Sequence, residues 1–292
     1  MDILSRMLRK IVVFVCLIAM CCGIGKGIHW AKKGFTIRRI AAPVRWKLEF
    51  WDNEADRAIL QPFRYLGRGR QCFAFASLDG QYVLKLPRTD IYQIPFWMRA
   101  LPLPSIRKEQ LLIERRNREE FVLNSMKIAY EELQSDTGVL GIHFGQTTNL
   151  GKELTIIDAL GCRYRLLAHK TAYVLQKKHP ILMRVFLETL HSGDRRKAQE
   201  ILDAMIDVVV ARGRKGIWNK DESFLRNYGF DGLKGYQIDI GSFYRKSDGA
   251  ASIYDTLHPV RTWLQTAAPE LLDSFDKSLE KRMADSLDLF RN

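Results

Sequence analysis

Apolar and polar positions alternate in the first half of the chain and follow helical spacing in the second. Alternation over 63–66, 73–77 and 82–86 predicts three strands, and Asp79-Gly80 is a strong hairpin turn between the last two. Further strands are predicted over 139–144, 154–157, 163–167 and 172–175. Strands that precede helices indicate an α+β fold with two lobes.

Helical spacing is clearest in a long charged segment, 105–134. Leu112, Glu119, Met126 and Leu133 recur every seven positions, so Glu119 falls on an otherwise apolar face. Its carboxylate either faces inward toward a cation or lies at the helix edge with its charge in water. Helices are also predicted over 180–190, 195–211, 256–264 and 269–289.

The first 31 residues predict a membrane anchor. Residues 11–24 are apolar and uncharged and follow a basic stretch, 6–10. Extension to Trp30, with Lys26 snorkelling, gives the roughly 20 residues that span a bilayer. We expect an uncleaved single-pass anchor that makes the protein membrane-associated. A signal peptide, a lipoprotein-type cysteine and a buried N-terminus remain alternatives, and basic residues on both flanks leave the orientation open.

Composition adds a preference for anionic partners. The 292 residues carry a formal net charge of +13, which favours nucleotide phosphates, anionic lipid or nucleic acid as partners. A solvated basic surface is the alternative. The basic residues are spread along the chain without a nucleic-acid motif, so no specific nucleic-acid partner is expected. Five cysteines show no zinc or disulfide spacing, which favours a reducing compartment and a cytoplasmic body. The basic segment 32–62 either lies on anionic lipid beside the membrane or packs on the first lobe.

Two glycines and a lysine mark the predicted sheet as a candidate phosphate site. Gly67 and Gly69 cap the first hairpin, where backbone amides can approach phosphate oxygens closely. Neither a Walker loop nor a Rossmann turn fits, because no Gly-Lys-Ser/Thr follows and the next element is a strand. Lys85 lies in an apolar run and needs a phosphate or carboxylate partner if it faces inward. The alternative is a lysine that faces water on an edge strand.

A second group of polar residues follows the helix at 195–211. Asp221 precedes Asn227 by six positions, and a short hairpin then leads to Asp239, with Gly241 two residues later.

The order of these motifs resembles the protein-kinase-like superfamily over about residues 63–245. Leu66-Gly67-x-Gly69 looks like the glycine-rich loop, Val83-Leu84-Lys85 like the strand lysine, Asp221…Asn227 like the catalytic loop, and Asp239-Ile240-Gly241 like the metal-binding Asp-Phe-Gly. Cys72 replaces the third glycine, Asn219-Lys220 replaces His-Arg, the Asp-to-Asn spacing is one residue longer, and no Ala-Pro-Glu segment follows. The chain is closest to a compact, atypical bacterial kinase-like or aminoglycoside-phosphotransferase-like branch.

The resemblance implies a two-lobed kinase-like fold: an N-lobe with an antiparallel sheet and one long helix, and a mostly helical C-lobe. It divides the chain into an anchor (1–31), a basic juxtamembrane segment (32–62), an N-lobe (63–178) and a C-lobe (179–292). The implied roles are phosphate binding by Gly67, Gly69 and Lys85, support of Lys85 by Glu119, Mg²⁺ binding by Asn227 and Asp239, and proton acceptance by Asp221. ATP, Mg²⁺ and an unknown hydroxyl acceptor are the implied partners. A pseudokinase and a membrane-attached adaptor without nucleotide remain alternatives.

Overall fold

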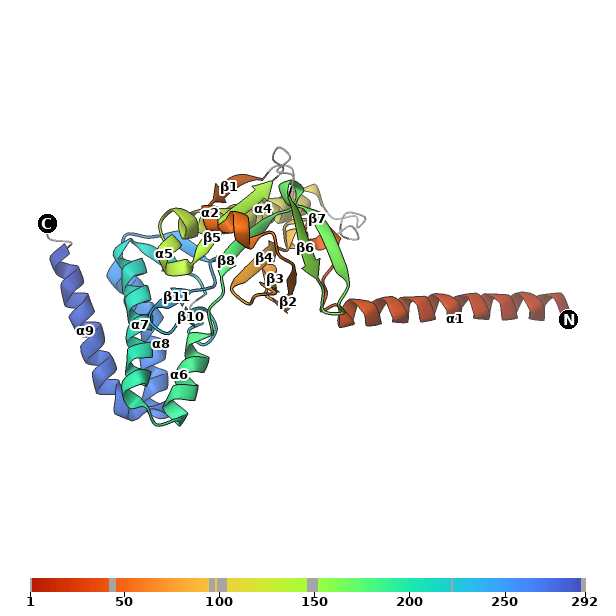
Figure 1. Ribbon diagram of the computed structural model, residues 1–292. Helices are drawn as coiled ribbons and strands as arrows, with labels where there is room; N and C mark the ends of the chain where they lie inside the picture. The colour runs from red at the N-terminus through yellow and green to blue at the C-terminus, as the bar shows by residue number, and fades with distance from the viewer. Residues whose placement is uncertain are drawn as a thin grey trace.

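The computed structural model describes residues 2–41, 46–94, 98, 104–145, 152–221 and 223–289. The strands are β1 (Lys47–Trp51), β2 (Phe63–Arg68), β3 (Cys72–Ser77), β4 (Tyr82–Pro87), β5 (Val139–Gly145), β6 (Glu153–Ile157), β7 (Arg163–Leu167), β8 (Tyr173–Lys177), β9 (Ile217–Asn219), β10 (Tyr228–Phe230), β11 (Gly235–Gln237) and β12 (Phe243–Arg245). The α-helices are α1 (Asp2–Ala31), α2 (Asn53–Ala58), α4 (Ser105–Glu131), α5 (Gln134–Thr137), α6 (Leu182–His191), α7 (Arg195–Arg214), α8 (Gly249–Ala267) and α9 (Leu272–Leu289). Figure 1 shows a sheet part, a helical part beside it, and α1 extending away from both.

The predicted strands join one eight-stranded sheet with the order β1-β5-β8-β4-β3-β2-β6-β7. The prediction of an antiparallel sheet is wrong at one position. β2 and β6 run parallel, with Phe63 beside Ile156 and Arg64 beside Ile157, whereas the other neighbouring strands of this sheet are antiparallel. The β6–β7 hairpin docks as a unit with β6 against β2, where it covers an edge that would otherwise expose unpaired backbone groups.

The sheet part also begins earlier in the chain than predicted. β1 lies within the segment 32–62 and pairs with β5, from Lys47 opposite Gly145 to Trp51 opposite Gly141. Trp46 is 3% exposed, and the following α2 is also packed on the sheet part. Of the two alternatives for 32–62, packing on the first lobe therefore describes residues 46–59.

Different elements cover the two faces of the sheet. Successive residues on β8 show the division, because Tyr173 and Leu175 belong to one apolar cluster and Val174 belongs to another. The first cluster includes Phe35, which follows α1. The second includes Val122 of α4. Helix α4 thus covers the second face and confirms the long helix predicted over 105–134.

The helical part is built around α7, which packs against α6, α8 and α9. Helices α7 and α8 approach closely at Gly213 and Gly249: a Cβ added at Gly249 would lie 2.2 Å from the carbonyl oxygen of Gly213. Helix α8 begins at Gly249, earlier than predicted, because the Asp248 carboxylate accepts a 2.9 Å hydrogen bond from the amide of Ala251 and caps it.

Polar contacts join the helical part to the C-terminal end of the α4–α5 segment. The Lys234 ammonium lies 3.0 Å from an Asp136 carboxylate oxygen, and the Lys215 ammonium lies 3.8 Å from the other oxygen. The Arg245 guanidinium pairs with the Glu132 carboxylate. The cationic ends of these pairs are exposed and the Asp136 side chain is only 12% exposed, so the pairs join the two parts at the rim of their contact.

Helix α1 is the element that the anchor prediction concerns. Val12–Ala31 is long and apolar enough to span a membrane, and none of this stretch is buried by the rest of the protein. Figure 1 shows α1 as a single straight helix whose N-terminus lies far from the body. Length and composition are weak evidence for a membrane span, since a signal sequence has the same properties.

Candidate functional site

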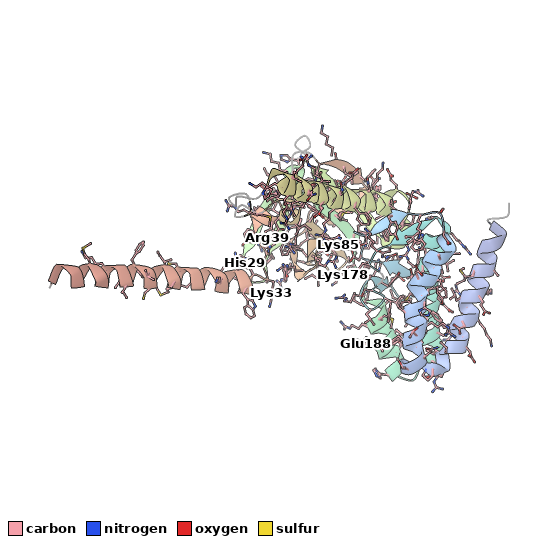
Figure 2. The ribbon with its side chains drawn as sticks, turned by 180° about the vertical axis from the view of Figure 1, so that it is seen from behind. His29, Lys33, Arg39, Lys85, Lys178 and Glu188 are labelled. Carbon is pink, nitrogen blue, oxygen red and sulfur yellow. The ribbon has the colours of Figure 1, made fainter. Side chains whose placement is uncertain are left out.

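Lys85 lies on β4 in the region between the sheet part and the helical part (Figure 2). Its side chain is half-buried, and its ammonium donates to the backbone carbonyl of Ile238. Of the two alternatives for Lys85, the structure has the inward-facing one. The partner is a carbonyl rather than the phosphate or carboxylate that was expected, and it belongs to the residue that precedes Asp239.

The segment Asp239–Gly241 is fixed by α4. The Ser125 hydroxyl donates to the carbonyl of Ile240 at 2.6 Å and accepts from the amide of Phe243 at 2.6 Å. The Ile240 side chain is 1% exposed and packs in the same cluster as residues of α4. The Asp239 carboxylate accepts a 3.3 Å hydrogen bond from the amide of Gly241. The backbone around Asp239 is thereby held from both sides.

The turn between β2 and β3 contacts this segment through Gln71. The Gln71 carboxamide donates to the Gly241 carbonyl at 3.3 Å, and a Cβ added at Gly241 would lie 1.9 Å from the Gln71 side-chain oxygen. Gly67 is the last but one residue of β2, and the amide of Gly69 donates to the carbonyl of Cys72 at 2.9 Å. The turn between β2 and β3 therefore contacts Gly241 through Gln71.

The pKa of the Cys72 thiol depends on charged residues around the turn. Burial raises the pKa of its thiol to about 11, the Lys85 ammonium opposes the rise, and the Asp239 carboxylate adds to it. An ammonium favours the thiolate form of a cysteine and a carboxylate disfavours it, so Lys85 and Asp239 act on the pKa of this thiol in opposite directions.

Asp221 and Asn227 lie in the loop that joins β9 to β10, and this loop is tied to the Asp239 segment. The side-chain Nδ2 of Asn227 donates to the backbone carbonyl of Asp221 at 2.8 Å. The backbone carbonyl of Asn227 accepts from the backbone amide of Ile238 at 2.8 Å. The amide of Asp221 donates to the Asn219 side-chain oxygen at 3.1 Å. Asn227 is 6% exposed. The loop thus brings Asp221 and Asn227 to the same region as Asp239.

Glu119 lies on the inward face of α4, as its phase predicted, and is 5% exposed. Its carboxylate accepts from the indole Nε1–H of Trp46. The support of Lys85 by Glu119 stays a prediction, since the contacts described for the two side chains join them to Ile238 and Trp46.

The connection from β8 to α6, called the hinge below, joins the sheet part to the helical part, and Tyr236 of the β10–β11 hairpin packs on it. The His179 ring stacks on the Tyr236 ring at 3.8 Å between centroids with an interplanar angle of 6°. Burial lowers the pKa of His179. The amide of Lys178 donates to the Gln81 carbonyl at 2.8 Å. The hinge backbone is therefore held by residues from both parts.

Sequence reasoning missed Gln71, Ser125 and Trp46, which make the contacts that connect the predicted residues. Ser125 carried one usable signal: it lies between Val122 and Met126 on the buried face of α4, where a hydroxyl needs partners. Gln71 and Trp46 carried no comparable signal, because their contacts reach residues more than 70 positions away.

The donor atoms near Asp239 fit the predicted magnesium ion. The side-chain Nδ2 of Asn227 donates to the backbone carbonyl of Asp221, so its Oδ1 is the atom that could bind a metal. Asp239 could add a carboxylate oxygen. Mg²⁺ takes oxygen ligands and often uses one or two protein side chains together with phosphates. Within the described ranges, no group of three or more His, Cys, Asp or Glu side chains could hold a metal. The role of each site residue stays a prediction.

No family model matches the chain, and no curated protein matches it. Structures of WbdD are similar: a crystal structure of WbdD matches with 15% identity and a TM-score of 0.37, over 72% of this chain and 44% of the WbdD chain. A co-crystal structure of WbdD with the kinase inhibitor LY294002 matches with 15% identity and a TM-score of 0.38, over 73% of this chain and 44% of that chain. A structure described as the bifunctional kinase-methyltransferase WbdD matches with 16% identity and a TM-score of 0.35, over 72% of this chain and 43% of that chain. The chain spans less than half the length of these WbdD chains, and a likeness of this size does not identify a function.

Proposed function

We propose that the chain is a kinase-like phosphotransferase, anchored in a membrane by α1, that moves the γ-phosphoryl group of ATP to a hydroxyl of an acceptor. The observation that carries the proposal is the convergence of Lys85, Asp239 and the glycine-rich turn. Lys85 contacts the residue before Asp239, and Gln71 of the turn contacts Gly241. These residues come from three separate stretches of sequence and meet where the sheet part faces the helical part.

Phosphoryl transfer depends mainly on positioning and charge neutralisation. In the proposed mechanism Lys85 and the amides of the turn at Gly67–Gly69 orient the phosphates. Asp239 and Asn227 would hold Mg²⁺, which would neutralise charge on the phosphate oxygens. Asp221 accepts the proton of the attacking hydroxyl.

The test is thermal unfolding of the full chain in neutral detergent during titration with Mg·ATP. Nucleotide at one hundred times its Kd stabilises by about 2.7 kcal/mol, which corresponds to a rise in Tm of roughly 5–10 °C for a protein of this size. Asp239→Asn should abolish the Mg-dependent part of the rise, and Lys85→Met should weaken it. Asp255→Asn is the matched control, because Asp255 is an exposed aspartate on α8.

A well-folded wild-type protein whose Tm does not respond to Mg·ATP would contradict the proposal. So would an equal response in Asp239→Asn and wild type, since Asp239 would then have no part in binding the nucleotide.

A second candidate is a pseudokinase that binds nucleotide or a partner without catalysis. The observation in its favour is Gln71, whose side chain rests on Gly241 and covers the backbone beside Asp239. Asn219 and Lys220 in place of His-Arg point the same way. ADP formation separates the two candidates. A saturable Mg·ATP shift without ADP formation against protein, sugar and aminoglycoside acceptors favours the pseudokinase, whereas turnover lost in Asp221→Asn favours the enzyme.

A further inference from the structure

The end of α1 is fixed to the sheet part. The helix ends where Lys33 and Gly34 take positive φ values of 52° and 76°, and the amide of Gly34 donates to the carbonyl of His29 at 2.9 Å. Phe35 then enters the core at 0% exposure, and its ring packs edge-on against Phe73 at 5.3 Å. The left-handed turn and the buried phenylalanine together set the position of the helix end relative to the sheet.

Lys32 adds a polar connection at the same place. Its ammonium donates to the Tyr164 hydroxyl at 2.7 Å and lies 3.3 Å from an Asp158 carboxylate oxygen. The Asp158 side chain is buried and also accepts from the amides of Leu160 and Cys162. The end of α1 and the sheet part are therefore fixed relative to each other, and together they form one surface.

That surface contains a cavity of about 1020 Å³ between the last turns of α1 and β2. Its lining combines cationic or titratable groups with aromatic rings: Lys26, His29, Lys33 and Arg68 with Trp30 and Tyr65. Figure 2 places His29 and Lys33 where α1 meets the body. A cavity with this lining suits a ligand that carries an anionic group next to apolar surface.

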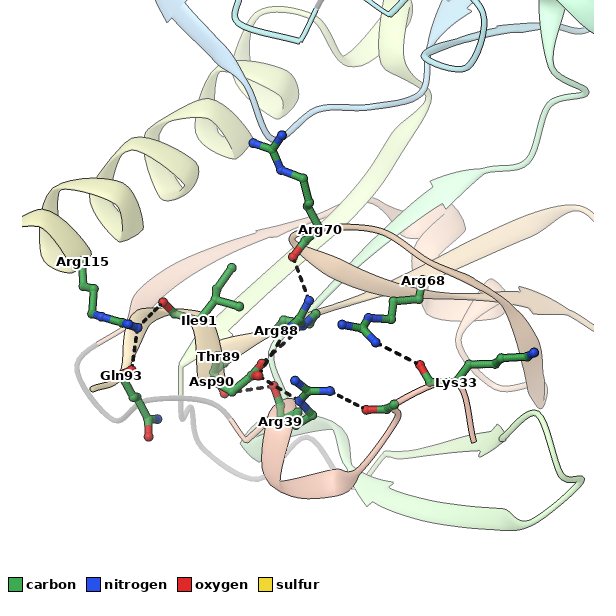
Figure 3. Close-up of polar contacts among 11 residues, drawn as sticks. Lys33, Arg39, Arg68, Arg70, Arg88, Thr89, Asp90, Ile91, Gln93 and Arg115 are labelled. Atoms are coloured by element: carbon green, nitrogen blue, oxygen red, sulfur yellow. Dashed lines mark hydrogen bonds and ion pairs between the residues drawn. The ribbon is translucent and has the colours of Figure 1, made fainter. Parts of the chain in front are cut away.

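More cations lie behind the cavity (Figure 3). Arg39 and Arg88 share the carboxylate of Asp90, with N–O distances of 2.8 and 3.2 Å. Asp158, which lies 3.3 Å from the Lys32 ammonium, is a second carboxylate near the end of α1. Burial lowers the pKa of Arg68, and the positive charges of Arg88 and Arg39 lower it further. The cations around Arg68 thus exceed the local negative charge, so an anion placed there would be stabilised.

If α1 spans a bilayer, the cavity lies at the boundary between the hydrocarbon core and the headgroup layer. Lys33 follows the end of the span at Ala31, whereas Lys26 lies five residues inside it, about 7–8 Å along the helix, so its ammonium reaches the headgroup layer by snorkelling. The headgroup layer on each side of the hydrocarbon core is about 5–7 Å thick. Trp30 is 76% exposed and Leu66 of β2 is 52% exposed. Tryptophan and basic residues near the end of a span are typical of this layer.

We propose that this cavity binds the headgroup of an anionic phospholipid, with the phosphate held by Lys26, Lys33 and Arg68 and the acyl chains lying along the apolar surface of α1. The preference for a lipid over a free phosphate follows from Trp30 and from the continuity of the cavity with a helix that no other described element covers. The site would orient the body against the membrane. It rests on the proposed membrane anchor and not on the phosphotransferase activity.

The experiment uses the full chain in neutral detergent micelles and measures Tm while dioctanoyl-phosphatidylglycerol is added. We expect a saturable rise in Tm. The triple variant Lys26→Gln, Lys33→Gln, Arg68→Gln should bind about fivefold more weakly for each lost cation, or roughly one hundredfold in total. The matched control removes three exposed arginines of the helical part, Arg184→Gln, Arg195→Gln and Arg196→Gln, whose side chains are 77%, 70% and 86% exposed.

Two parallel titrations distinguish the sources of the anion. Dioctanoyl-phosphatidylcholine tests for apolar contact alone, and glycerol 3-phosphate tests for a site that takes soluble phosphates. The proposal is supported if only the anionic lipid raises Tm and only the cavity variant loses the effect. It is overturned if the remote variant weakens binding equally, if either parallel ligand gives the same rise, or if no ligand changes the Tm of the wild-type protein.

Discussion

Replacing Ser125 with alanine removes both hydrogen bonds that join α4 to the Asp239–Gly241 segment. Ser125 is 0% exposed, and its hydroxyl bonds the carbonyl of Ile240 and the amide of Phe243, each at 2.6 Å. Without the hydroxyl, both backbone groups are buried without this partner. Each such group costs about 1–3 kcal/mol, so we expect local stability to fall by about 2–6 kcal/mol.

The assay is hydrogen exchange of the full chain, followed by mass spectrometry over peptides that cover residues 239–245. A local loss of 2 kcal/mol speeds exchange through opening by roughly thirtyfold. Ser77→Ala is the control, because Ser77 is 4% exposed and its hydroxyl accepts from the amide of Tyr82 at 2.9 Å in a different hairpin. Exchange over 239–245 that is unchanged in Ser125→Ala, or equally fast in Ser77→Ala, would refute the reasoning.

Two further changes test the packing and the electrostatics. Gly249→Ala should destabilise the helical part by roughly 1–3 kcal/mol, because the new Cβ would lie 2.2 Å from the carbonyl oxygen of Gly213; denaturant unfolding measures this, and an unchanged midpoint would contradict the close approach of α7 and α8. The Cys72 thiol, with its pKa raised to about 11, should be alkylated slowly at pH 8 and faster as the pH rises toward 11, because the thiolate is the nucleophile. Asp239→Asn should speed the alkylation by removing a charge that raises this pKa, and Lys85→Met should slow it; mass spectrometry of the Cys72 peptide gives the rates, and changes of the same sign would contradict the placement of both charges.

Local sequence patterns predicted most of the helices and strands, because the formation of these elements depends on residues that are close together in sequence. The three strands over 63–86 were predicted from alternation and the Asp79-Gly80 turn, and β2, β3 and β4 confirm them. The face of α4 that carries Glu119 was predicted from a seven-residue spacing, and the burial of Glu119 agrees with it.

The parallel pairing of β6 with β2 and the place of β1 at the sheet edge could not be predicted in this way. Both depend on which strand edges remain open once the central hairpins have formed, and no local pattern encodes that choice.

The candidate site was predictable only in its individual residues. Lys85 and Asp239 were selected by type, order and neighbours, whereas the contacts that join them come from Gln71 and Ser125. The position of Ser125 on the buried face of α4 signalled that its hydroxyl needs partners but not which ones, and Gln71 carried no signal, because both side chains bond backbone more than 100 residues away. Trp46 was assigned to a basic segment, and only the pairing of β1 with β5 brings its indole to Glu119.

The most direct test of the central claim is to identify the lysine that lies beside the phosphates of bound ATP. An acyl-phosphate derivative of ATP transfers its acyl group to a nearby lysine, and peptide mass spectrometry of the full chain locates the label. Our account predicts Mg-dependent labelling of Lys85 that excess ATP prevents and that Asp239→Asn reduces. Labelling confined to other lysines, or labelling of Lys85 that ATP does not prevent, would contradict the account.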